Sequence, residues 1–62
     1  MTEKKWDLVW KGSAPMAEIA EKMFAANGID VLHREKGPED VELFVPDDYL
    51  QTAEELLRDW TI

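Results

Sequence analysis

The sequence contains no cysteine and only one histidine, His33. The absence of cysteine excludes disulfide bonds, thiolate zinc sites and thiol catalysis, because each of these needs a cysteine sulfur atom. Histidine is the side chain that acts most often in acid–base catalysis, and here it occurs only once. We therefore predict a protein that is not an enzyme and that holds no cofactor and no metal.

Long apolar runs and phosphate-binding loops are missing as well. No segment approaches the roughly 20 apolar residues that a helix needs to cross a membrane. The first six residues have no apolar run behind their lysines, so we expect no signal peptide and a cytoplasmic location. The three glycines form neither a G-x-G-x-x-G nor a G-K-[ST] motif, and the sequence therefore gives no indication of a dinucleotide or P-loop site.

Positive charge is scarce, because 7 Lys and Arg residues face 14 Asp and Glu residues and the net charge is −7. Nucleic-acid backbones and anionic membranes both require clustered cations. We predict that neither is a partner. The acidic balance permits a basic partner, but it more often serves to keep a small protein soluble.

Three segments alternate apolar and polar residues in the pattern typical of strands with one buried face. They cover residues 5–11, 29–34 and 41–45, and a loop containing Gly37-Pro38 is expected at residues 35–40. The side chains that we expect beneath the helices are Trp6, Leu8, Trp10, Val31, Val41, Leu43 and Val45.

Two further segments repeat apolar residues at spacings of three and four, which indicates amphipathic helices. The first follows Gly12-Ser13 and ends at Asn27-Gly28, and the second follows Asp47-Asp48. The expected buried stripe of the first helix comprises Met16, Ile19, Ala20, Met23 and Phe24. That of the second comprises Tyr49 or Leu50, then Ala53, Leu56, Leu57 and Trp60.

The order strand–helix–strand–strand–helix predicts a single ferredoxin-like α+β domain over residues 1–62. This is a two-layer βαββα sandwich with a three-stranded antiparallel or mixed sheet. A right-handed crossover between the first two strands gives the spatial order 1-3-2. Both helices cover one face of the sheet, and the fourth strand of the complete fold is missing.

The other face of this sheet is predicted to be uncovered and is the first candidate for an interface. Val9, Leu32 and Phe44 are expected to form an apolar stripe across the strands. The flanking charged residues are Lys11, Arg34 and Glu42. An apolar stripe rimmed by polar groups is typical of a contact site, although single exposed apolar residues are also common on solvated surfaces. The unpaired edge of the first strand is a second candidate.

His33 supports two alternative functions. The first is a small-ligand sensor that uses a pocket between sheet and helices near His33. The second is an enzyme in which His33 acts with Glu35, Glu39 and Asp40, which lie nearby in the sequence, but catalysis requires partners held in fixed geometry. We favour this enzyme hypothesis least.

Several stretches together carry a resemblance to a known family: Trp6–Trp10, residues 23–29, residues 41–48 and residues 53–57. They resemble a family of small bacterial proteins of unknown function, described as signal-transducing, with a PII-like, ferredoxin-related fold. The resemblance covers nearly the whole chain and implies a small binding or regulatory module without an established ligand or reaction. The loop at residues 35–40 is too short to match the long nucleotide-binding loop of PII proteins, so no functional residues transfer.

These observations predict a non-enzymatic regulatory module that acts by binding. The partner is expected to be another protein or a second copy of the chain, which would give a homodimer. The sequence does not specify a small-molecule ligand.

Overall fold

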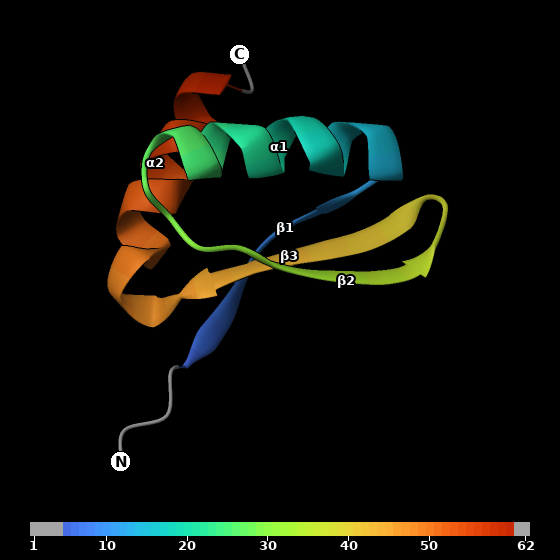
Figure 1. The fold of residues 1–62 in the computed structure, drawn as a ribbon, viewed down its shortest axis with the longest axis horizontal. Coiled ribbons are helices and arrows are strands. Elements are labelled where there is room, and N and C mark those ends of the chain that lie inside the picture. Colours follow the sequence, from blue (N-terminus) through green and yellow to red (C-terminus); the bar gives the residue numbers. More distant parts are fainter. Residues whose placement is uncertain (1–4, 61–62) are drawn as a thin grey trace.

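The computed structural model describes residues 5–60, so both ends of the predicted 1–62 domain, residues 1–4 and 61–62, lie outside the described residues. The chain follows the order β1, α1, β2, β3, η1 and α2 (Figure 1). The bounds of these elements are Trp6–Gly12 (β1), Ala14–Ala26 (α1), Leu32–Gly37 (β2), Asp40–Pro46 (β3), Asp47–Tyr49 (the 3-10 turn η1) and Leu50–Trp60 (α2).

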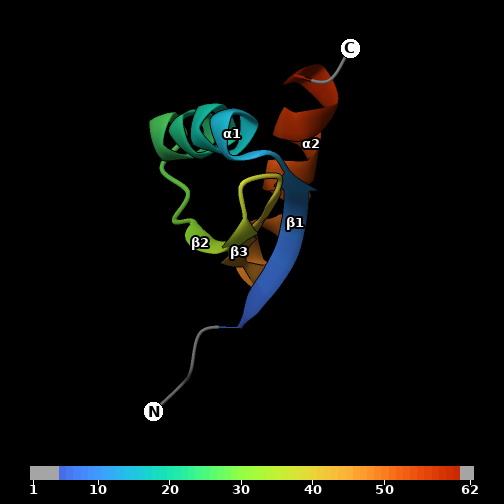
Figure 2. The same ribbon diagram turned by 90° about the vertical axis from the view of Figure 1, so that its right-hand side faces the viewer.

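The three strands form one sheet in the order β1-β3-β2, and both neighbouring pairs are antiparallel. β1 and β2 therefore run parallel to each other, as a crossover through α1 requires. Figure 2 shows both helices on the same side of the strands, and both contact β1 and β3. This arrangement confirms the predicted ferredoxin-like α+β fold. Within residues 5–60, neither helix combines the length and apolar character needed to span a bilayer.

The hydrophobic core lies between the helices and the central strand. Its eight buried residues are Ala17, Ala20, Phe24, Ile29, Val41, Leu43, Val45 and Ala53. The three β3 residues alternate along the strand as predicted, so they all point toward the helices. Most of the helix residues in this core are alanines, which allow both helices to approach the sheet closely, and Phe24 is the largest side chain that is fully buried.

The predicted stripe of α1 was wrong at two positions. Met16 and Ile19 are 43% and 50% exposed, whereas Ala17, which was not predicted, is fully buried. The helix turns its alanine face toward the sheet, because small side chains permit closer packing than methionine or isoleucine at the same positions. In α2, Leu50 rather than Tyr49 packs against the core, and Leu56, Leu57 and Trp60 contact it as expected.

The predicted second strand, residues 29–34, begins and ends too early. The N–H of Ile29 donates to the carbonyl of Phe24, and the N–H of Gly28 donates to that of Ala25. With Gly28 at φ 73°, this is a Schellman motif, which closes the helix and places Ile29 in the core beside Phe24. β2 therefore starts only at Leu32.

The predicted loop at residues 35–40 is mostly strand. β2 extends to Gly37, which pairs with Asp40 of β3, and only Pro38 and Glu39 form the turn. The sequence Gly-Pro was correctly interpreted as a turn signal, but the strands on both sides extend further toward it than the alternation indicated.

β1 contains a bulge that reverses its faces. Leu8 pairs with Phe44 and Trp10 pairs with Leu43, so Val9 is the extra residue between them. A bulge places two residues of one strand opposite one residue of the next and shifts the alternation by one. The prediction that Trp6, Leu8 and Trp10 share a face was therefore wrong. Trp10 packs against the core, while Leu8 lies on the opposite side of the sheet with Phe44.

Trp10 fills the space in front of Gly12. The two residues lie on the same face of β1, and a Cβ atom on Gly12 would lie 2.6 Å from the Cη2 atom of Trp10. The indole ring has little freedom to move, because it packs against the core and its centroid lies 6.4 Å from that of Trp60.

We expect Gly12→Ala to lower the free energy of unfolding by about 1–3 kcal/mol, because the new methyl group displaces a packed indole ring. Urea denaturation followed by tryptophan fluorescence measures this loss. Gly37→Ala is the matched control, since a Cβ at Gly37 meets no atom within 4 Å. Equal stability of the two variants would contradict the packing of Trp10 against Gly12.

Candidate interaction surface

The sheet face that points away from the helices is formed by alternate strand residues. Residues directly opposite each other on neighbouring strands share a face, and Val41, Leu43 and Val45 occupy the helix side. We call the remaining surface the open face. Its strand residues, assigned from the register and two ion pairs, are Trp6, Leu8, Lys11, Leu32, Arg34, Lys36, Asp40, Glu42, Phe44 and Pro46. Neither helix lies on this side of the strands (Figure 2), although Pro46 at one end of the face is buried.

A row of three apolar residues crosses the open face. Leu8 and Leu32 both pair directly with Phe44, one from each side. Directly opposite residues have Cβ atoms about 5 Å apart, so the three side chains form a continuous strip, the apolar row. Leu8 is 50% and Leu32 is 45% exposed. Phe44 lies between them and is half-buried, so the row presents mainly the two leucine side chains to solvent.

The predicted stripe contained Val9 in place of Leu8. Val9 is the bulge residue and packs against the core from a partly buried position, so its predicted place on the open face was wrong. Leu32 and Phe44 lie where they were predicted. Strict alternation along β1 assigned Leu8 to the wrong face, and no feature of residues 6–12 alone marks the position of the bulge.

A charged row lies next to the apolar row. Lys11 and Arg34 both pair directly with Glu42 in the register. Lys36 reaches the same carboxylate, with its Nζ atom 3.5 Å from Oε1 of Glu42. Glu42 is only 8% exposed. The aliphatic parts of long basic side chains can lie over a neighbour while their charged ends stay in water. The positions of Lys11, Arg34 and Glu42 agree with the prediction, and their role in binding stays a prediction.

The open face thus consists of two halves. The apolar half contains Trp6, Leu8, Leu32, Phe44 and Pro46, and the charged half contains Lys11, Arg34, Lys36, Asp40 and Glu42. The charged half has three cations and two carboxylates, which gives a net charge of +1 (3 − 2). This differs from the chain as a whole, whose net charge is −7.

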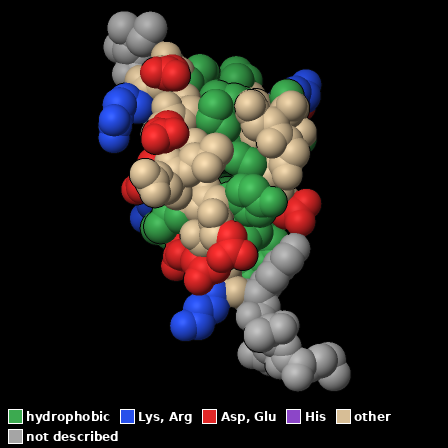
Figure 3. Space-filling view, turned by 90° about the vertical axis from the view of Figure 1, so that its left-hand side faces the viewer, with side chains coloured by type: hydrophobic (Ala, Val, Ile, Leu, Met, Phe, Trp, Pro, Cys, Tyr) green, Lys and Arg blue, Asp and Glu red, His purple; other side chains and the backbone are tan. Residues whose placement is uncertain are grey.

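The surface around η1 and α2 carries charge of the opposite sign. Seen from the side on which α2 lies in Figure 1, hydrophobic side chains form a band with acidic groups beside it (Figure 3). The 3-10 turn η1 and helix α2 together contain five acids and one basic residue, Arg58: the acids are Asp47, Asp48, Glu54, Glu55 and Asp59. The cations of the open face therefore represent a local exception on an acidic protein.

Both edges of the sheet have features that discourage strand pairing. No described strand pairs with the outer edge of β1, but the bulge at Val9 interrupts the regular spacing of its backbone groups. The outer strand β2 is exposed from Leu32 to Lys36 and carries charged side chains at Arg34, Glu35 and Lys36. Bulges and charges are devices that protect edge strands from pairing with other chains. The structure therefore favours the open face over the first-strand edge as the contact surface.

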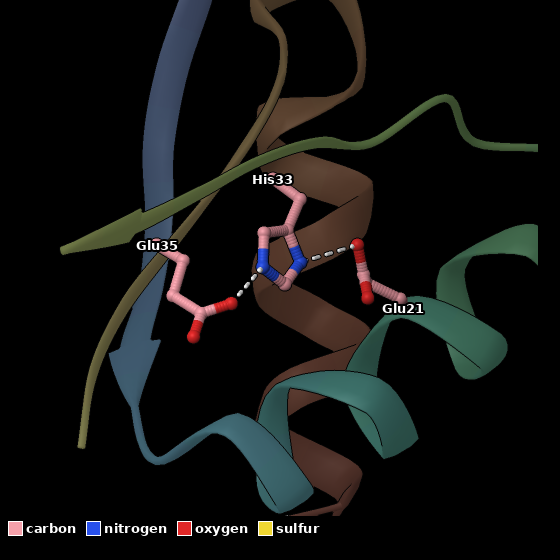
Figure 4. Close-up of polar contacts among 3 residues, drawn as sticks. All are labelled: Glu21, His33 and Glu35. Carbon is pink, nitrogen blue, oxygen red and sulfur yellow. Dashed lines mark hydrogen bonds and ion pairs between the residues drawn. The ribbon is translucent and has the colours of Figure 1, made fainter. Parts of the chain in front are cut away.

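His33 lies on the helix side of β2, opposite Leu43. Its Nδ1 atom is 3.1 Å from Oε1 of Glu21 on α1, and its Nε2 atom is 3.7 Å from Oε1 of Glu35 (Figure 4). Only a doubly protonated imidazole can donate to both carboxylates at once. Since both ring nitrogens face carboxylates of the chain itself, the arrangement resembles a link between β2 and α1 more than a base aimed at a substrate.

The predicted acidic neighbours of His33 are only partly confirmed. Glu35 is close, whereas Glu39 lies in the hairpin turn and Asp40 pairs with Lys11 at 3.6 Å. Glu21 was missed, because it lies 12 residues earlier in the chain and only the packing of α1 brings it to His33. Among residues 5–60, no group of three or more His, Cys, Asp or Glu side chains is arranged to hold a metal ion.

Comparison of this chain with protein-family models, with curated proteins and with solved structures found no match. The resemblance to the PII-like family therefore stays a prediction.

The ion pair between Lys36 and Glu42 is expected to stabilise the sheet more than an ordinary surface pair. We expect Lys36→Gln to lower the free energy of unfolding by about 1 kcal/mol, because it removes a cation from a nearly buried carboxylate. Lys22→Gln is the control, since Lys22 pairs with Glu18 at 3.8 Å on exposed α1, where such pairs contribute about 0.3–0.5 kcal/mol. Urea denaturation of both variants measures the difference, and a larger loss for Lys22→Gln would refute this interpretation.

Proposed function

We propose that this protein is a cytoplasmic, non-enzymatic regulatory module that acts by binding another protein chain through its open face. The observation that carries the proposal is the apolar row of Leu8, Phe44 and Leu32, which crosses all three strands in register. Exposed apolar side chains that form a contiguous strip with charged groups beside it are typical of contact surfaces. A place in the PII-like signal-transducing family that the sequence resembles is part of this proposal.

The size of the open face favours a reversible contact. Three strands at a spacing of ~4.8 Å and about seven residues long give a face of roughly 14 by 23 Å, or about 300 Å². Stable complexes usually bury about 800 Å² on each partner. A partner that contacts this face alone would therefore bind weakly and dissociate readily, which suits a regulatory function.

A second copy of the chain is the alternative partner. A domain of 62 residues has a small core, and binding to the native state raises stability by mass action. Covering the apolar row in a homodimer would therefore stabilise the fold. The experiment below separates the two partners by the mass of the product.

Photo-crosslinking tests the proposed surface. A photoreactive residue at Leu32 is expected to form adducts in an extract of the source organism, because the open face contacts its partner there. The matched control carries the same residue at Ile19 of α1, which is similarly exposed on the helix side. Mass spectrometry identifies the adducts, and an adduct with twice the mass of the chain indicates a homodimer.

Substitution of the apolar row provides the specificity control for this experiment. Leu8→Lys is expected to abolish the adducts formed at position 32, because it places a charge within the row at a residue that is already half exposed and so leaves the fold intact. Circular dichroism checks the fold. If position 32 forms no adducts, or if positions 19 and 32 form the same adducts, the proposal fails.

A further inference from the structure

The two halves of the open face require a partner with two matching parts. The apolar half needs an apolar stripe to cover Leu8, Phe44 and Leu32, and the charged half needs groups that complement its cations. From this arrangement we propose that the occupant of the open face is an acidic amphipathic helix of another protein. The inference rests on the proposed function and specifies its partner by chemical class.

The distribution of charge supports an acidic partner. Of the six Lys and Arg residues within residues 5–60, three lie on the open face: Lys11, Arg34 and Lys36. Of the 13 Asp and Glu residues in the same range, only Asp40 and Glu42 do. Arg34 makes no ion pair within residues 5–60, so its guanidinium group is available to a carboxylate of a partner.

The acids elsewhere on the molecule do not cancel this local preference. At physiological ionic strength the Debye length is about 8 Å, so exposed charges farther apart than this interact weakly. The acids of α2 belong to a helix on the other side of the sheet (Figure 2), while a ligand on the open face lies next to Lys11, Arg34 and Lys36. The nearest charges therefore decide which sign of ligand is favoured.

The dimensions of the open face match one helix. A width of about 14 Å for three strands accommodates a single α-helix with side chains, which is ~10–12 Å across. An amphipathic helix also provides an apolar stripe together with charged residues on its flanks. An added strand would instead require backbone groups at a sheet edge, where the bulge and the charged side chains oppose pairing.

A second copy of the chain fits this face poorly. Two copies packed face to face are related by a two-fold axis in the plane between them. If this axis runs along the strands, the three cations of one copy lie against the three cations of the other. If the axis runs across the strands, the cations of one copy lie against the apolar half of the other. The chain's own acidic helix, α2, cannot serve as the ligand of another copy, because its apolar stripe already packs against its own core.

Two synthetic peptides test this inference. Both have the same helix-forming sequence with a leucine stripe, and they differ only in carrying glutamates or lysines on the flanks. We expect the full chain to bind the glutamate peptide at least about tenfold more tightly than the lysine peptide at low salt, with a smaller preference at high salt. Nuclear magnetic resonance titration should place the amide shifts at Leu8, Leu32 and Phe44. Non-specific attraction to the chain, whose net charge is −7, would favour the lysine peptide instead, so it cannot produce the expected preference.

Arg34→Gln identifies the source of the preference. It is expected to weaken binding of the glutamate peptide about threefold, which is the size of one exposed ion pair. The ion pair between Lys36 and Glu42 remains in this variant. Lys22→Gln on α1 is the matched control and should leave the affinity unchanged, because it removes the same charge from the helix side.

The outcomes separate this inference from the proposed function. Equal or tighter binding of the lysine peptide, no binding of the glutamate peptide, or shifts confined to α1 and α2 would overturn the acidic-helix inference. If crosslinking from position 32 still captures a partner in that case, the proposed function stands without this partner class. If neither experiment detects binding at the open face, both are wrong.

Discussion

The packing of β3 beneath both helices is the constraint on which the other features of this protein depend. Val41, Leu43 and Val45 are fully buried and contact residues from both helices. β3 is also the central strand, so its alternation fixes the faces of β1 and β2 through their registers. Because the side-chain period of a strand is two, burying these three residues necessarily turns Glu42 and Phe44 to the opposite side. The core and the open face thus have one origin.

The bulge at Val9 adds a second constraint of equal consequence. One extra residue in β1 lets Trp10 reach the core and brings Leu8 beside Phe44. Without the bulge, Leu8 and Trp10 would lie on the same face of β1. Either Trp10 would then leave the core or Leu8 would leave the apolar row. The same irregularity distorts the outer edge of the sheet. A single local feature therefore completes the apolar row and discourages strand pairing at this edge.

The charged row shows how an acidic protein can present a cationic surface. Glu42 lies nearly buried between Lys11 and Arg34, with Lys36 within ion-pair distance. Within residues 5–60, its carboxylate forms an ion pair with Lys36 alone and Lys11 pairs with Asp40, which leaves the charge of Arg34 uncompensated. Because screening limits the interaction of exposed charges to a range of about 8 Å, nearby residues set the sign of the charge on this half of the open face. That sign can differ from the sign of the net charge of the whole chain.

The sequence by itself determined the order of elements, the strand order, the alternation of β3 and the position of Leu32 and Phe44 on the face away from the helices, because these follow from local periodicity and chain connectivity. Only the tertiary structure decided that Leu8 replaces Val9, that Ala17 is buried in place of Met16 and Ile19, and that Glu21 meets His33. A bulge, the rotation of a helix about its axis and a contact between distant residues all depend on packing against the rest of the fold. Periodicity describes one segment at a time, so it contains no information about the surfaces that each segment meets.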